Sequence, residues 1–121
     1  MLAFVRNLFR KDPRGGRVVL RDESTSEDTR HLSASYSESG DLVIEGQDFG
    51  AGVEDAFGYR EYEWAWTIKE PDLAALSAAL SDGSNLLDAL ARRFSGPNAA
   101  FLFMFLTENK IPFEKWSRIG D

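Results

Sequence analysis

The chain has 121 residues, of which 43% are hydrophobic and 28% charged, with no cysteine, one histidine and a formal net charge of −6. This length fits one domain, which can bury roughly two-thirds of its unfolded surface without a metal or a disulfide. The lack of cysteine excludes thiol nucleophiles, disulfides, iron–sulfur clusters and cysteine-based zinc sites. A single histidine, His31, excludes HExxH and His-rich metal sites. Because no catalytic motif remains intact, we expect a protein that is not an enzyme and holds no cofactor.

The charge is divided unequally along the chain. Residues 1–17 contain five cations and one anion, a charge of +4, whereas residues 18–121 contain nine cations and nineteen anions, a charge of −10. An acidic body disfavours direct binding to nucleic acid, which draws on cations that face phosphates. It favours a cationic protein partner, since opposite fields speed and orient encounter. Plain solubility is the alternative explanation.

The first 17 residues are predicted to form a basic amphipathic helix followed by a Gly/Pro hinge. Apolar residues recur there at helical spacing, and cations lie between them (Leu2, Val5, Arg6, Leu8, Phe9, Arg10). Such a helix can dock on its own domain, in a partner's groove or on an acidic membrane surface. Arg6 interrupts the apolar run, which disfavours a signal peptide. The run Ala99–Leu106 is far shorter than the ~20 residues that span a bilayer, so we expect a cytoplasmic protein without a transmembrane segment.

The middle of the chain predicts about four strands within residues 17–69. Apolar and polar residues alternate in these stretches, and the aromatic run Tyr62, Trp64, Trp66 is typical of a strand face. A hairpin turn is expected around Gly40. The predicted strands are Arg17–Arg21, Arg30–Ser37, Leu42–Asp48 and Tyr59–Lys69, and the predicted loops are Asp22–Thr29 and Phe49–Gly58.

From residue 71 the apolar period changes from two to 3.6, which predicts three helices. The first begins at Pro71, the second has Ser84 as its N-cap, and the third follows Asn98. The third helix, Ala99–Glu108, is apolar almost all round, so it is either buried in the core or half of a homodimer interface. Ile111–Ile119 is a possible final edge strand. We therefore predict an α+β domain over residues 18–121, with three helices packed on one face of an antiparallel sheet.

Acidic residues are the only recurrent candidates for a site. Glu45, Glu61 and Glu63 are expected to share one sheet face, with Asp48, Glu54 and Asp55 nearby. Paired carboxylates can catalyse glycoside hydrolysis, but they need a deep cleft. A calcium or magnesium site is possible, although EF-hand spacing is missing. A solvated or partner-facing acidic patch needs no special geometry and is favoured.

Two other residue groups have ordinary structural explanations. His31 lies on the polar side of a predicted strand without a serine–acid pair, which favours a surface histidine over a catalytic one. The strand tryptophans are typical of a core. A nucleic-acid stacking platform would need interleaved cations, whereas Glu61 and Glu63 are acidic.

Three segments resemble small bacterial proteins, some of them immunity proteins that neutralise polymorphic or contact-dependent toxins. These segments are Leu42–Asp48, Tyr59–Trp66 and Ile111–Trp116, and the resemblance covers about residues 40–118. It implies an α+β protein that binds one toxin domain and blocks its active site or holds it inactive. The family shares no catalytic motif, so it implies no specific site residue.

The leading hypothesis is therefore an immunity-type inhibitor that binds a cationic, for example nucleic-acid-targeting, toxin domain. Its expected partner-binding residues are the acidic set and one tyrosine anchor: Glu45, Asp48, Glu54, Asp55, Tyr59, Glu61 and Glu63. One alternative is a small acid/base or metal-dependent enzyme with its site in residues 48–63. Another is a membrane-surface or partner adaptor that uses the basic N-terminal helix. Monomer and homodimer remain equally open.

Overall fold

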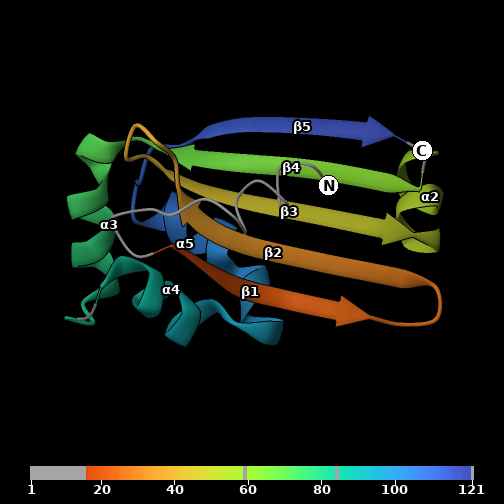
Figure 1. The fold of residues 1–121 in the computed structure, drawn as a ribbon, viewed down its shortest axis with the longest axis horizontal. Helices are drawn as coiled ribbons and strands as arrows, with labels where there is room; N and C mark the ends of the chain where they lie inside the picture. The colour runs from red at the N-terminus through yellow and green to blue at the C-terminus, as the bar shows by residue number, and fades with distance from the viewer. Residues whose placement is uncertain (1–15, 59, 84, 121) are drawn as a thin grey trace.

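A computed structural model describes residues 16–58, 60–83 and 85–120 and shows the predicted α+β architecture. Its five strands form one antiparallel sheet in the order β1-β2-β3-β4-β5, as Figure 1 shows. Each strand pairs with its neighbour in sequence, so the sheet is a meander closed by the predicted edge strand β5. The strands are β1 (Arg17–Ser24), β2 (Asp28–Tyr36), β3 (Leu42–Gly50), β4 (Glu61–Ile68) and β5 (Glu114–Gly120).

Three helices pack on one face of this sheet, which we call the helix face. In Figure 1, α5 lies behind the sheet, and α3 and α4 lie at the left of the view; short 3-10 helices precede α3 and α5. The elements are η1 (Glu70–Asp72), α3 (Leu73–Leu80), α4 (Leu86–Phe94), η2 (Gly96–Phe101) and α5 (Leu102–Glu108). None of the described helices is long and apolar enough to cross a membrane.

The strand register confirms the predicted alternation of faces. Ile44 pairs with Trp66, and Gly46 pairs with Trp64, so these apolar side chains share the helix face. A Cβ at position 46 would overlap the Trp64 indole, which explains why a glycine stands there. The core combines this face with the helices and includes Leu32, Ala34, Ile44, Ile68, Leu76, Leu90, Leu102 and Leu106.

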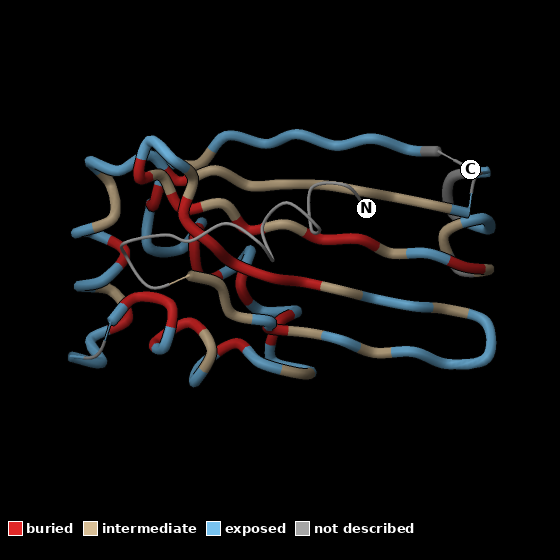
Figure 2. The backbone as a smooth tube through the Cα atoms, in the orientation of Figure 1, coloured by how far each residue is buried: buried red, intermediate tan, exposed pale blue. Residues whose placement is uncertain are grey.

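The two ends of the strands differ in burial. On β2 and β3 the end that lies against the helices, the covered end, is mostly buried, and the opposite, distal end is more exposed. Strand β4 is half-buried and β5 is exposed along their lengths (Figure 2). The distal end contains the turn between β1 and β2 and the short helix α2 (Ala51–Phe57), which joins β3 to β4. The strands are therefore longer than the helical layer that covers them.

Both predicted loops were wrong in extent. Strand β1 continues to Ser24, because a tight turn around Thr25 lets β2 begin at Asp28; the Thr25 N–H donates to the Asp28 carbonyl at 2.8 Å. The segment 49–58 contains the end of β3 and then α2, instead of a loop. This helix ends at Gly58, whose N–H donates to the Glu54 carbonyl at 2.8 Å.

The helix boundaries also differ from those predicted. Asn85 is the N-cap of α4, since its side-chain oxygen accepts from the Asp88 N–H at 2.9 Å; Ser84 lies outside the described residues. The third helix does not start at Asn98. Its first turn is the 3-10 helix η2, which has Pro97 near its start, where the missing proline N–H costs no hydrogen bond. The predicted amphipathic helix falls in residues 1–15, also outside the described residues.

Candidate interaction surfaces

The register separates the predicted acidic residues into three locations. Glu45, Glu61 and Glu63 share the sheet face opposite the helices, as predicted; Glu45 pairs with Ala65, and Glu63 pairs with Gln47. Asp48 instead lies on the helix face, because it is one residue out of step with Glu45 and Gln47. Glu54 and Asp55 are exposed on α2, and Tyr59 lies outside the described residues.

Glu61 and Glu63 form a network instead of an open acidic patch. Arg118 Nη2 lies 3.5 Å from Glu61 Oε1 and 3.2 Å from Glu63 Oε1, and the Gln47 amide donates to Glu61. Only 14% and 17% of the two glutamate side chains is exposed. Burial alone would raise the pKa of Glu63, but hydrogen bonds from Arg118 and with Glu61 hold that pKa below its ordinary value. Much of the negative charge of this pair is therefore already balanced within the sheet.

Two of the predicted acidic residues, Glu54 and Asp55, face solvent at the distal end. There, the start of α2 lies beside the β1–β2 turn: the Ala51 N–H donates to the Glu27 carbonyl at 3.4 Å, and a Cβ on Gly50 would overlap that oxygen. Gly50 has a φ of +132°, which only glycine adopts readily. Because of this contact, four acidic residues from two segments form one surface, which we call the acidic tip (Glu27, Asp28, Glu54, Asp55).

Glu54 of the acidic tip has a cationic neighbour, Arg60. Arg60 Nη1 lies 3.5 Å from Glu54 Oε1, and both side chains are about half exposed, so this pair is weak. Sequence reasoning identified Glu54 and Asp55 but missed Glu27 and Asp28. The sequence pattern predicted a loop over Asp22–Thr29, so it did not reveal the turn that brings residue 27 against residue 51.

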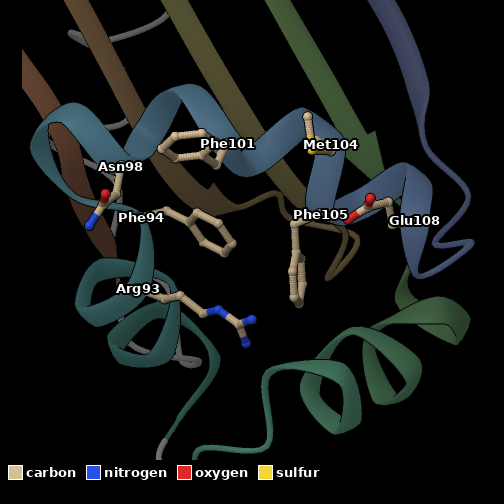
Figure 3. A pocket seen from close by; sticks show the side chains of 7 residues that line it. All are labelled: Arg93, Phe94, Asn98, Phe101, Met104, Phe105 and Glu108. Carbon is tan, nitrogen blue, oxygen red and sulfur yellow. The ribbon is translucent and has the colours of Figure 1, made fainter.

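A second candidate surface is an apolar groove between α4 and α5 (Figure 3). Its volume is about 350 Å³, and its lining combines aromatic and methionine side chains from α4, η2 and α5 with the polar side chains of Arg93, Asn98 and Glu108. The Arg93 guanidinium lies 4.5 Å from the centroid of the Phe105 ring. Phe101 and Met104 are 57% and 54% exposed. Exposed aromatic, methionine and arginine side chains are typical of protein interfaces.

The apolar third helix has one buried side and one exposed side. Leu102, Phe105 and Leu106 are buried in the core, whereas Phe101, Phe103 and Met104 are exposed. The helix is therefore half core and half surface. Periodicity did not separate these halves, because apolar residues occupy both sides of it.

A smaller cleft of about 190 Å³ lies between the sheet and η2, beside Trp64, Trp66 and Phe103. Asp48 lines it, and burial raises the pKa of this carboxyl, although the charges of Arg30 and Arg21 oppose the rise. Asp48 is the only carboxylate among the lining residues, so this cleft lacks the second carboxylate that acid/base glycoside hydrolysis requires. Across the described ranges, no group of three or more His, Cys, Asp or Glu side chains is placed to hold a metal ion.

His31 is part of a structural contact on the face opposite the helices. Its Nε2 lies 3.0 Å from Arg17 Nη2, and its Nδ1 lies 3.7 Å from Asp22 Oδ1. Burial, followed by the charge of Arg17, lowers the pKa of His31 below its ordinary value, while Asp22 acts in the opposite direction. The imidazole is therefore neutral at neutral pH and contacts Arg17 as a packed polar group.

Comparison of the chain with protein-family models, with curated proteins and with solved structures finds no match. The candidate surfaces must therefore be judged on their own charge, exposure and geometry.

Proposed function

We propose that this protein is a non-enzymatic, immunity-type binding module that neutralises a cationic toxin domain, and that the acidic tip is its electrostatic contact. The observation that carries the proposal is the gathering of Glu27, Glu54 and Asp55 as exposed carboxylates, from two distant segments, at the end of the sheet that the helices leave open. The −10 charge of residues 18–121 has the same sign as this surface.

The physical basis is electrostatic steering. A toxin domain that acts on nucleic acid needs a cationic surface to contact phosphates. An acidic surface on the inhibitor accelerates encounter with this cationic surface and then covers it, so that nucleic acid cannot bind there. The exposed carboxylates of α2 are free of the Arg118 network that neutralises Glu61 and Glu63, so they contribute their charge to encounter.

The test uses a panel of purified, immobilised toxin domains that are cationic and act on nucleic acid. The double variant Glu54→Lys/Asp55→Lys should lower the association rate constant by about tenfold at low salt and flatten its dependence on ionic strength. Dissociation should change less, because rim charges act mainly on encounter. Stopped-flow or surface-based kinetics at two salt concentrations measure both rates.

A matched control makes the same change of charge at the covered end. Glu70→Lys/Glu114→Lys replaces two exposed carboxylates there and should leave the association rate within about twofold of the unaltered protein. Equal slowing by both double variants would assign the effect to net charge instead of to the acidic tip. Absence of binding by the unaltered protein would reject the immunity-type function.

A further inference from the structure

The apolar groove between α4 and α5 is open to solvent. Phe101 and Met104 in its lining are more than half exposed, whereas Phe94 and Phe105, which also line it, are buried (Figure 3). Exposed apolar side chains beside a hollow are typical of surfaces that another macromolecule covers. The charged groups of the same lining indicate which macromolecule fits the groove.

Arg93 and Glu108 contribute opposite charges to this groove. Arg93 comes from α4 and Glu108 ends α5, and Figure 3 shows them on opposite sides of the Phe105 ring. Both residues are exposed, and within the described ranges neither side chain has a hydrogen-bond or ion-pair partner. The Arg93 guanidinium lies 4.5 Å from the centroid of the Phe105 ring, and a guanidinium stacked on a ring keeps its N–H edge available for a carboxylate.

We propose that the occupant of this groove is the same surface of a second copy of this chain, in a two-fold symmetric dimer. In such an interface each residue pair occurs twice, so Arg93 of each copy can meet Glu108 of the partner subunit. The surface is thereby complementary to itself, because it carries one unpaired charge of each sign around an apolar centre.

The direction of the helices fits this pairing. Phe101, Met104 and Glu108 are three and four residues apart, so they share one side of the η2–α5 segment. Two such sides in antiparallel contact place the end of each α5 against the start of the partner's η2. Because η2 directly follows α4, Arg93 near the end of α4 lies at that start, where the partner's carboxylate arrives.

The surface around the groove is nearly neutral, although the chain as a whole is acidic. Residues 86–110, which contain α4, η2 and α5, hold three cations and two anions, a charge of +1, against −6 for the whole chain. Two copies of an acidic protein repel each other where their acidic surfaces meet. Contact through this neutral surface avoids that repulsion.

A dimer formed in this way does not cover the acidic tip. The tip lies at the distal end of the sheet, whereas the groove belongs to the helical layer. Each copy still presents its own exposed carboxylates to a partner, so this proposal and the proposed function can fail separately.

The dependence of molecular mass on concentration tests the interface. Sedimentation velocity of the full chain should show a monomer at about 5 μM and mainly a dimer at about 500 μM, as expected for a small interface. Arg93→Glu and Glu108→Arg should each raise the dimer dissociation constant by about tenfold or more, because like charges then meet twice. Arg60→Glu makes the same change of charge at the distal end and should alter that constant by less than about twofold.

An equimolar mixture of the two single variants gives the sharpest comparison. Residue 93 of each copy then faces an opposite charge at residue 108 of the other copy. The mixture should therefore dimerise with a dissociation constant within about threefold of the unaltered protein's. Both variants keep a negative net charge, so neither attraction between whole molecules nor a loss of folding can produce this rescue.

Three results would overturn the proposal. A monomer at every concentration would show that copies of the chain do not associate and would leave the groove to a different protein. A dimer that both single variants leave intact would place the contact on another surface. A mixture that stays as weak as the single variants would show that residues 93 and 108 do not meet across the interface.

A second variant keeps the test valid if Arg93→Glu gives no cooperative thermal transition. Met104→Lys places a charge on the exposed side of α5 and should raise the dimer dissociation constant by about tenfold or more, because the dimer would bury that charge. An unchanged constant in this variant would reject the groove as the interface.

Discussion

The two ends of the sheet differ in what surrounds equivalent strands. At the covered end, Ile44 and Ile68 are 0% exposed and pack against the helices. At the distal end, Phe49 on β3 and Ile119 on β5 are 42% and 43% exposed. One end therefore supplies most of the apolar burial that stabilises the fold, and the other presents charge to solvent.

In the proposed function, this difference separates the residues that stabilise the fold from those that contact the partner. Binding surfaces tolerate charge and exposed aromatic groups because they do not have to hold the fold together. Substitutions at the covered end should therefore change the free energy of unfolding, while those at the distal end should change association with the partner.

The largest expected effect compares one residue type at the two ends. Ile44→Ala should lower the free energy of unfolding by about 2–5 kcal/mol, because it leaves a cavity under the helices. Ile119→Ala should lower it by less than about 1 kcal/mol, since this side chain already contacts water. Urea denaturation of both variants measures the difference. Equal losses would show that the distal end is as important for stability as the covered end.

A smaller loss of stability is expected for a substitution in the middle of β3. Gly46→Ala places a methyl group where the Trp64 indole lies and should destabilise the fold by about 1–3 kcal/mol. Trp64 fluorescence should also change, since the ring must move to make room. A variant with unchanged stability and an unchanged emission spectrum would contradict the close packing of Gly46 against Trp64.

The smallest expected effect is a pH dependence of the free energy of unfolding, which comes from His31 on the sheet face opposite the helices. The pKa of His31 is lower in the folded protein than its ordinary value of 6.5, because of burial and then Arg17. The unfolded chain binds the proton more readily, so folding stability should fall as the pH drops below about 6.5 and level off below the folded-state pKa.

His31→Gln should flatten that part of the profile. The measurement is the difference in the free energy of unfolding between the variant and the unaltered protein, from about pH 7.5 to about pH 5.5, which cancels the carboxylates common to both. A difference that does not change with pH would show that His31 has no lowered pKa in the folded protein.

Much of the fold could be predicted from period-two and period-3.6 patterns. The alternation around Trp64 and Trp66 identified the helix face correctly, because each sheet face has one environment. The predicted loops failed because a tight turn at Thr25 and the short helix α2 depend on a few backbone hydrogen bonds, which no apolar period encodes.

The candidate surfaces were less predictable than the fold. Register could be inferred for Glu45, Glu61 and Glu63, but not the approach of Glu27 to α2, which joins residues far apart in sequence. The network around Arg118 was also missed, because Arg118 lies beside Glu63 only when β5 pairs with β4. The exposure of Phe101 and Met104 depends on where α4 ends and α5 begins, a packing outcome that composition does not determine.

The most direct test of the separation between the two ends is hydrogen exchange of the protein in complex with a cationic toxin domain that it binds. The account predicts new protection in the β1–β2 turn, residues 25–28, and in α2, with unchanged exchange in α3. Protection confined to α4, η2 and α5 would place the contact at the apolar groove instead and would contradict the role assigned to the acidic tip.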